Sequence, residues 1–357
     1  MDRLQMNWGE GDSTMAEITV IITTYNLEAH IDRCFKELFA QSYQDFDIVV
    51  VDDCSKDKTG EILKRWAEQY PNRVRLLLLQ KNVGACSRTR NIALDSGLVT
   101  GRYICFLDGD DAIESTYLQK LHEALIAHDA DLSICGYDRI EQSTGYVLCD
   151  EMLGFKPSVV DMPVDSDLWT VINPAVWNKM YKAELFRELR FSDVVVGEDT
   201  IMLYTLSQRI KRMVFIDEKL IHYGVRAGSV INTTSEVAIH ELADALLRCY
   251  HAARTQAERH VIAKAAFLHI GISMAIRAYD NVSIKMKEHL RWTWNYICDN
   301  FDGMKDNPYM KLSYQMKNGM KGMLLWGCLI GYRLHIFGFV LRIYSVIRKI
   351  LHIDIKF

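Results

Sequence analysis

Five short runs of apolar and β-branched residues recur over the first part of the chain, and segments with helical spacing separate them. In one such segment, Tyr117, Leu121 and Leu125 share a face of a helix with about 3.6 residues per turn. Strands that alternate with helices form a mostly parallel sheet with helices on both faces, and such sheets bind ligands at the carboxyl ends of their strands. The pattern therefore predicts an α/β, Rossmann-like fold. The predicted strands are Ile18–Ile22, Asp47–Val51, Val74–Leu79, Tyr103–Leu107 and Leu132–Cys135.

The rest of the chain predicts a second, helical part. At 357 residues the chain is longer than most single domains. The alternation fades after about residue 150, and long helical segments follow Glu236. We therefore predict a flexible N-terminal lead at residues 1–16, an α/β domain at 17–235 and a helical C-terminal subdomain at 236–357. The lead lacks the apolar stretch of a secretory signal, and the nine cysteines show no CxxC pairs, so we expect a cytoplasmic protein with reduced thiols.

The C-terminal segment is basic and apolar. From Lys305 to Phe357 there are nine Lys or Arg and two Asp or Glu, a charge of +7, against −4 for the whole chain and hence −11 for the rest. The longest uncharged run, Gly322–Tyr332, has 11 residues, fewer than the roughly 20 that span a bilayer. A helical wheel separates Arg342 and Lys349 from apolar residues. Residues 322–357 are therefore expected to lie on an anionic membrane surface, or alternatively to pack on protein as an ordinary amphipathic helix.

Acidic and polar residues follow the predicted strands. Asp52 and Asp53 follow the second strand, and Asp108, Asp110 and Asp111 follow the fourth. Clustered carboxylates are hard oxygen donors suited to Mg²⁺ or Mn²⁺. A metal held there could neutralise the charge that develops on a departing diphosphate. The alternative is a capped turn, because Asp111 precedes a good helix.

Four motifs occur in order at these strand ends, and together they resemble the family 2 glycosyltransferases with the GT-A fold, of the bacterial surface-polysaccharide type. The motifs are Val20–Asn26, Val49–Asp53, Asn82–Gly84 with Arg90 and Asn91, and Phe106–Asp111. The resemblance covers about Ile18 to Val230. One departure is Thr23, where many members carry proline.

The resemblance implies a binding site for a UDP-sugar donor. Thr23 and Tyr25 would hold and stack on the uracil ring, and Asp52 would accept a hydrogen bond from it. Asp108 and Asp110 match the DXD motif, with Asp110 as the direct metal ligand. The remaining donor-site residues by resemblance are Asn82, Gly84 and Arg90 on the nucleotide side and Arg226 and Ser229 on the diphosphate.

The resemblance also places a catalytic base and an acceptor side. Asp199, with Glu198 as the second candidate, would take the proton from an acceptor hydroxyl, which is a poor nucleophile at neutral pH. Helix capping is the alternative for Asp199. Trp177 and Asn178 would line the acceptor side, although Trp177 could equally be a core residue.

The predicted function is an inverting transfer of a sugar from a UDP-sugar to a hydroxyl of a growing, or lipid-linked, glycan at the inner face of the cytoplasmic membrane, with no nucleic-acid partner. Self-association stays open. A sugar nucleotidyltransferase is the rival enzyme, but it would carry a Gly-rich basic loop where this chain has Thr23–Asn26. A non-catalytic sugar-binding protein is the other alternative.

Overall fold

The computed structural model describes residues 5–6, 15–141, 144–163, 166–225, 235–279, 284–304 and 306–351. The chain divides into two compact units. The first comprises Met1–Met162, Asn173–Met202 and Leu206–Arg226, and the second comprises Pro163–Ile172, Leu203–Thr205 and Ala227–Phe357. The second unit thus also includes two short segments that the sequence analysis placed in the α/β domain.

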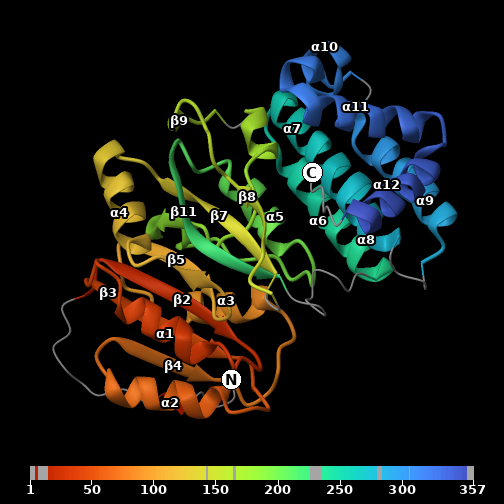
Figure 1. The fold of residues 1–357 in the computed structure, drawn as a ribbon. Coiled ribbons are helices and arrows are strands. Elements are labelled where there is room, and N and C mark those ends of the chain that lie inside the picture. The colour runs from red at the N-terminus through yellow and green to blue at the C-terminus, as the bar shows by residue number, and fades with distance from the viewer. Residues whose placement is uncertain are drawn as a thin grey trace. The chain divides into compact units, whose positions relative to one another are not determined.

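A mixed 11-stranded sheet forms the centre of the first unit (Figure 1). Its main path runs β1-β4-β3-β2-β5-β10-β7-β11-β6, with β8 paired to β7 and β9 paired to β11. Strands β2 to β5 are mutually parallel, β11 is parallel to β7, and β10 is inserted antiparallel between β5 and β7. The strands are β1 Gln5–Met6, β2 Ile18–Thr24, β3 Phe46–Asp52, β4 Val74–Leu78, β5 Tyr103–Asp108, β6 Ala112–Ile113, β7 Leu132–Glu141, β8 Val147–Glu151, β9 Val159–Asp161, β10 Lys179–Lys182 and β11 Arg212–Val225.

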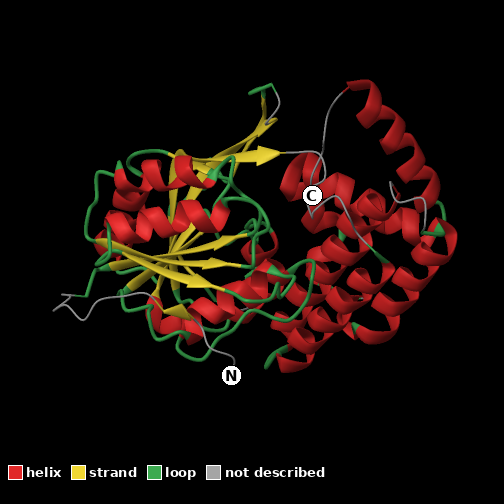
Figure 2. Ribbon diagram, turned by 90° about the horizontal axis from the view of Figure 1, so that it is seen from below, coloured by secondary structure: helices red, strands yellow, loops and turns green. Residues whose placement is uncertain are grey.

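Helices lie on both sides of these strands (Figure 2), which confirms the predicted α/β fold. They are α1 Ile31–Phe39, α2 Thr59–Gln69, α3 Cys86–Asp95, α4 Tyr117–His128 and α5 Glu198–Leu206. Every residue of β2 and β3 is buried, as expected where both faces of a sheet are covered. Full burial of a side chain such as Ile22 or Val50 stabilises the fold by about 1.5–3 kcal/mol.

The second unit is helical in its described part, which confirms the predicted helical C-terminal region. Helices α6 and α7 begin at capped positions: the Ser235 hydroxyl accepts a hydrogen bond from Ala238 N, and the Thr255 hydroxyl accepts one from Glu258 N. The main helices are α6 Glu236–Ala252, α7 Gln256–Ala266, α8 Ala275–Tyr279, α9 Met286–Asn300, α10 Leu312–Gln315, α11 Gly319–Arg333 and α12 Phe337–Leu351, with a π-helical stretch Phe267–Met274 between α7 and α8.

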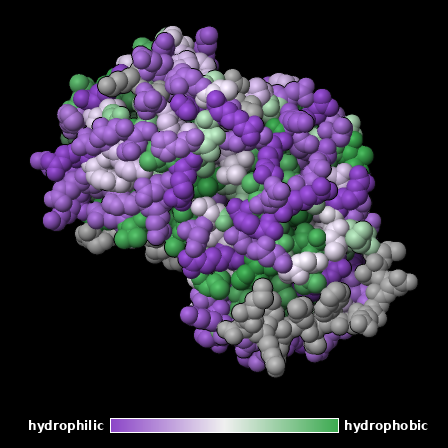
Figure 3. All heavy atoms as spheres, turned by 180° about the vertical axis from the view of Figure 1, so that it is seen from behind, coloured by the Kyte–Doolittle hydropathy of each residue, from purple (hydrophilic) through white to green (hydrophobic). Residues whose placement is uncertain are grey.

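One helix in the described part of the chain, Gln256–Tyr279, is long and apolar enough to cross a membrane. Within its most apolar 18-residue window, 72% is buried inside the protein. Ala263, Phe267 and Ile270 are fully buried, as in the central helix of a helical bundle. The surface in Figure 3 is mainly hydrophilic, with hydrophobic residues in smaller groups.

Candidate active site

The carboxyl ends of three adjacent strands bring the predicted motifs together in the first unit. In the strand register, Thr24 of β2 lies opposite Asp52 of β3, and Thr23 lies opposite Asp108 of β5. Because these strands are parallel, the loops that follow them leave the sheet at the same edge. The sheet therefore places residues from three distant motifs around one region.

The loop after β2 turns sharply at Asn26, whose φ of 53° is in the left-handed region that Asn tolerates. Its side-chain oxygen accepts a hydrogen bond from Lys56 N at 2.8 Å, and its own N–H donates to the Ser55 hydroxyl at 2.9 Å. Tyr25, immediately before the turn, is 47% exposed. Its ring is available to stack on a planar ligand, whereas Thr23 is buried beside it.

Asp52 and Asp53 fix the neighbouring loops. The buried carboxylate of Asp52 accepts hydrogen bonds from the Thr24 hydroxyl at 3.0 Å and from the Ser55 hydroxyl at 2.6 Å. The Asp53 carboxylate accepts from Val83 N at 2.6 Å and from Gly84 N at 3.1 Å. Asp53 thus holds the Asn82–Gly84 turn in place. The sequence analysis assigned no role to Asp53, although its position next to Asp52 was a signal for one.

Arg90, on α3, lies at the centre of the acidic residues. Its side chain is 3% exposed, and its guanidinium donates to Asp108 Oδ1 at 3.0 Å and to Asp199 Oδ1 at 2.7 Å. Glu198 Oε1 lies 3.8 Å away. Burial alone would lower the pKa of Arg90, but Asp199 and Asp108 outweigh it and raise that pKa. The sequence analysis expected Arg90 to line the nucleotide side; the structure places its charge between the DXD motif and the candidate base.

Packing around Gly109 and hydrogen bonds from Arg33 hold the turn that follows β5. A Cβ atom on Gly109 would lie 2.9 Å from Ile31 Cδ1 and 3.1 Å from Leu27 Cδ1, so a larger residue here would require these side chains to shift. Arg33 donates to the backbone oxygen of Asp110 at 2.6 Å and to that of Asp111 at 3.2 Å. The close packing and the two hydrogen bonds fix the backbone that carries the acidic side chains.

Asp111 does not act as a helix cap, which was the alternative for this cluster. The N-cap position of α4 is Thr116 instead. Asp111 is 2% exposed, and its Oδ2 has no hydrogen-bond partner among the described residues. Burial raises the pKa of Asp111, and the carboxylates of Asp108 and Asp110 raise it further. A nearby cation would offset this repulsion.

The described acidic side chains supply only some of the ligands that a metal ion needs. Among the described residues, no group of three or more His, Cys, Asp or Glu side chains is arranged to hold an ion by itself. His222 is a further possible metal ligand near this loop, but both of its ring nitrogens already have carboxylate partners. They lie 2.8 Å from Asp138 Oδ1 and 3.0 Å from Glu114 Oε1. A cation at Asp108 and Asp110 would therefore need further ligands from a bound molecule or water.

Glu198 and Asp199 are the first two residues of α5. The Asp199 carboxylate accepts a hydrogen bond from Arg90 at 2.7 Å. Because Asp199 lies inside α5 as its second residue, it does not occupy the N-cap position of that helix. Burial raises the pKa of Asp199, and Arg90 counteracts part of that shift. The pKa of Glu198 is raised by burial and by the adjacent Asp199.

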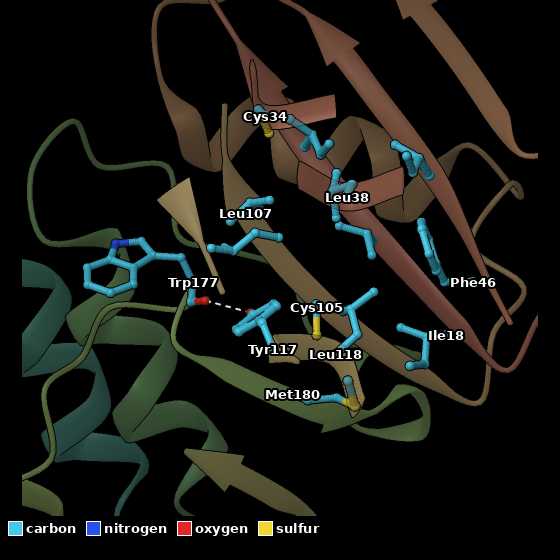
Figure 4. Packing of buried hydrophobic residues seen from close by; sticks show 14 of the residues in the cluster. Ile18, Cys34, Leu38, Phe46, Cys105, Leu107, Tyr117, Leu118, Trp177 and Met180 are labelled. Atoms are coloured by element: carbon cyan, nitrogen blue, oxygen red, sulfur yellow. Dashed lines mark hydrogen bonds between the residues drawn. The ribbon is translucent and has the colours of Figure 1, made fainter. Parts of the chain in front are cut away.

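Trp177 and Asn178 are both buried, at 6% and 0% exposure. The Trp177 ring stacks on Tyr223 with centroids 5.2 Å apart, and its carbonyl accepts a hydrogen bond from the Tyr117 hydroxyl at 2.8 Å (Figure 4). The Asn178 amide donates to Cys135 O at 2.9 Å. The structure corrects the expectation that these side chains line the acceptor side, and it supports the core alternative for Trp177. Arg226 and Ser229 lie outside the described residues.

The fold and the acidic strand-end motif together are typical of the GT-A class of proteins. Residues 19–190 match the model of the glycosyl transferase family 2, so this segment is similar to that family.

Relatives with curated descriptions include two glycosyltransferases of Streptococcus pneumoniae serotype 4. Glycosyltransferase GlyA is 30% identical over 241 residues, which are 64% of this chain and 34% of GlyA. Glycosyltransferase GlyG is 28% identical over 232 residues, 62% of this chain and 75% of GlyG. The chain therefore spans about a third of GlyA and three quarters of GlyG.

Among solved structures, S. aureus TarS 1-349 in complex with UDP-GlcNAc is similar, with a TM-score of 0.67 and 19% sequence identity. The match covers 89% of this chain and 92% of TarS 1-349. At this identity the likeness supports the fold.

Proposed function

We propose that this protein transfers a sugar from a UDP-sugar to a hydroxyl group of a growing glycan, with inversion at the anomeric carbon. The observation that carries the proposal is the single guanidinium of Arg90, which joins Asp108 of the DXD motif to Asp199 of α5. It brings a candidate metal-binding carboxylate and a candidate base into one site. The relatives support a glycosyltransferase, and TarS 1-349 binds UDP-GlcNAc in its complex.

The donor side would use the loops after β2, β3 and β5. Tyr25 offers an exposed ring for the base of the nucleotide, beside the turn that Asp53 holds. Asp110 and Asp108 would hold Mn²⁺ or Mg²⁺, which would neutralise charge on the leaving diphosphate.

The acceptor side would use Asp199 as the general base. A carboxylate accepts a proton more readily when its pKa lies closer to neutral, and burial raises the pKa of Asp199 in that direction. The hydrogen bond from Arg90 fixes the orientation of the carboxylate. In a single displacement, Asp199 would take the hydroxyl proton as the acceptor oxygen attacks the anomeric carbon.

Donor binding gives the first test of this proposal. UDP with Mn²⁺ is expected to stabilise the protein more than either alone, by about 2.7 kcal/mol when the ligand is at about 100 times its Kd. Asp110→Asn should remove the metal-dependent part of this stabilisation. The control variant Asp129→Asn changes a side chain that is 88% exposed, and it should retain the full stabilisation. Thermal unfolding with and without UDP and Mn²⁺ measures the stabilisation of each variant. Equal stabilisation by GDP or CDP would contradict the uridine assignment.

The helix α12 exposes an apolar face. Phe339, Val340, Ile343, Val346 and Ile347 are between 37% and 65% exposed, whereas Phe337, Leu341 and Ser345 are buried at 3–7% exposure. The helix thus packs on its own unit through Phe337, Leu341 and Ser345. Most of the apolar face that the helical wheel predicts is exposed. On α11, Met320, Met323 and Leu324 are also exposed.

Cations accompany these apolar faces. The segment from Asn307 to Ile353, which contains both helices, has no Asp or Glu, and Lys317, Lys321, Arg333 and Arg342 are exposed on it. Exposed apolar side chains with flanking cations fit an anionic lipid surface. We therefore include a cytoplasmic location at the inner face of the membrane, near lipid-linked acceptors, in the proposed function.

Membrane binding can be measured by flotation with anionic vesicles. The double substitution Ile343→Ser and Val346→Ser is expected to weaken binding at least tenfold, since each buried CH₂ contributes about 0.8 kcal/mol. Val237→Ser, at a 67% exposed valine on α6, is the matched control and should leave binding unchanged. If the wild-type protein does not float, or if the double variant dissociates a dimer instead, the face binds protein rather than lipid.

A further inference from the structure

Three side chains, each four residues from the next, connect helix α1 to the segment that carries the end of the DXD motif. Arg33 and Glu37 lie within α1, where a spacing of four places them on one face of the helix, and Gln41 follows the end of that helix. The segment that they contact runs from Asp110 to Leu118 and includes β6. Arg33 and Asp110 are 77 positions apart in the chain, so only the fold brings them together.

The first two side chains bind the backbone of the acidic turn itself. Arg33 Nη2 donates hydrogen bonds to the backbone oxygens of Asp110 at 2.6 Å and of Asp111 at 3.2 Å. Glu37 Oε2 accepts one from Ile113 N at 3.0 Å. Arg33 Nε also lies 3.7 Å from Glu37 Oε1, so the two side chains orient each other as well as the turn.

Gln41 holds the other end of the segment. Its Nε2 donates to Glu114 O at 2.8 Å, and its Oε1 accepts a hydrogen bond from Leu118 N at 3.0 Å. Gln41 is 3% exposed, so its removal would leave buried backbone groups without partners. The Arg33 side chain is 45% exposed, and it can be replaced without opening the core.

The turn that Arg33 holds carries a candidate metal ligand. A flexible turn would lose conformational freedom when its carboxylates bind an ion, and this loss would weaken binding. Groups that orient a ligand before the metal arrives avoid that loss, and removing one typically lowers metal affinity by about 10- to 100-fold. Contacts to the backbone on both sides of the Asp110–Asp111 peptide bond suit that role.

We propose that Arg33 is a positioning residue for the candidate metal site: by binding the backbone oxygens of Asp110 and Asp111, it holds the turn in the conformation that takes up Mn²⁺ or Mg²⁺. The inference rests on the proposed function, in which Asp108 and Asp110 hold the metal. Arg33 acts through the backbone of the turn.

Mn²⁺ binding in the presence of UDP tests this role. Arg33→Met is expected to weaken Mn²⁺ binding about 10-fold. The affinity for UDP in EDTA and the melting temperature of the metal-free protein should stay at their wild-type values. Lys36→Met is the matched control, because Lys36 is a 68% exposed cation on the same helix that pairs with Asp32. It should bind Mn²⁺ like the wild type.

Two results would overturn the inference. Equal weakening in Lys36→Met would assign the effect to the loss of positive charge. Parallel losses of UDP affinity in EDTA and of melting temperature in Arg33→Met would assign it to the stability of the fold. Amide hydrogen exchange gives a direct measure of the turn: the Ile113 N–H should exchange faster in metal-free Arg33→Met than in Lys36→Met. Equal exchange in the two variants would contradict the role of Arg33.

Asp110→Asn separates this inference from the proposed function. If Asp110→Asn binds Mn²⁺ as tightly as the wild type, the metal site in the proposed function is wrong. If Asp110→Asn loses Mn²⁺ binding but Arg33→Met retains the wild-type affinity, the metal site stands and the positioning role of Arg33 fails.

Discussion

Asp199→Asn is expected to lower the rate of sugar transfer by about 10² to 10⁴, the usual contribution of a general base. Asparagine keeps the shape of the side chain and can still accept the hydrogen bond from Arg90, but it cannot take a proton. Steady-state transfer rates, UDP affinity and melting temperature should be measured on the one variant. Only the transfer rate should change strongly.

Glu198→Gln is the matched comparison. Glu198 is the neighbouring residue, its side chain is 19% exposed against 21% for Asp199, and its carboxylate is 3.8 Å from Arg90. We expect a smaller loss of transfer than for Asp199→Asn. A larger loss of transfer in Glu198→Gln than in Asp199→Asn would assign the role of the base to Glu198. Loss of UDP binding in Asp199→Asn would place that residue in the donor site instead.

Arg90→Met is expected to lower the free energy of unfolding by up to about 3–5 kcal/mol at pH 7, because it removes a buried counter-charge from two partly buried carboxylates. Asp108 and Asp199 both bind this guanidinium, whose side chain is 3% exposed. Arg102→Met provides the control: Arg102 pairs with Glu17 at 3.2 Å, but its side chain is 75% exposed. An exposed pair contributes about 0–1 kcal/mol.

The loss in Arg90→Met should depend on pH. Arg90 lowers the pKa of Asp199 and of Glu198, so its removal raises both in the folded state. A carboxyl group with a folded pKa above its unfolded value binds protons more tightly when folded, and stability then falls as pH rises. Denaturant unfolding should therefore show a smaller difference between wild type and variant at pH 5 than at pH 7. A difference that grows at pH 5 would contradict this account of Arg90.

The strands and the order of the motifs could be predicted from the sequence because the information is local. Ile18–Ile22 and Tyr103–Leu107 are apolar runs of strand length, and the structure forms β2 and β5 over them. A parallel arrangement then brings the residues after each strand to one edge of the sheet. Asp108 and Asp199 could be selected because the short motifs that contain them resemble those of the family.

The partners of the site residues could not be predicted in this way. Arg90 is 109 positions from Asp199 in the chain, and only the folded sheet and α5 bring them within 2.7 Å. Whether Trp177 faces an acceptor or the core depends on Tyr223, which comes from β11.

The α/β fold, the helical C-terminal part and the order of the strand-end motifs all follow from local sequence patterns, because strand and helix periodicity depends on nearby residues. Tertiary structure alone decided which of these polar side chains meet, which are buried and which apolar face of α12 stays exposed. These outcomes depend on contacts between segments far apart in the chain, such as Arg90 with Asp199. No local pattern encodes them, since burial and charge pairing are set by whatever the rest of the fold places alongside each residue.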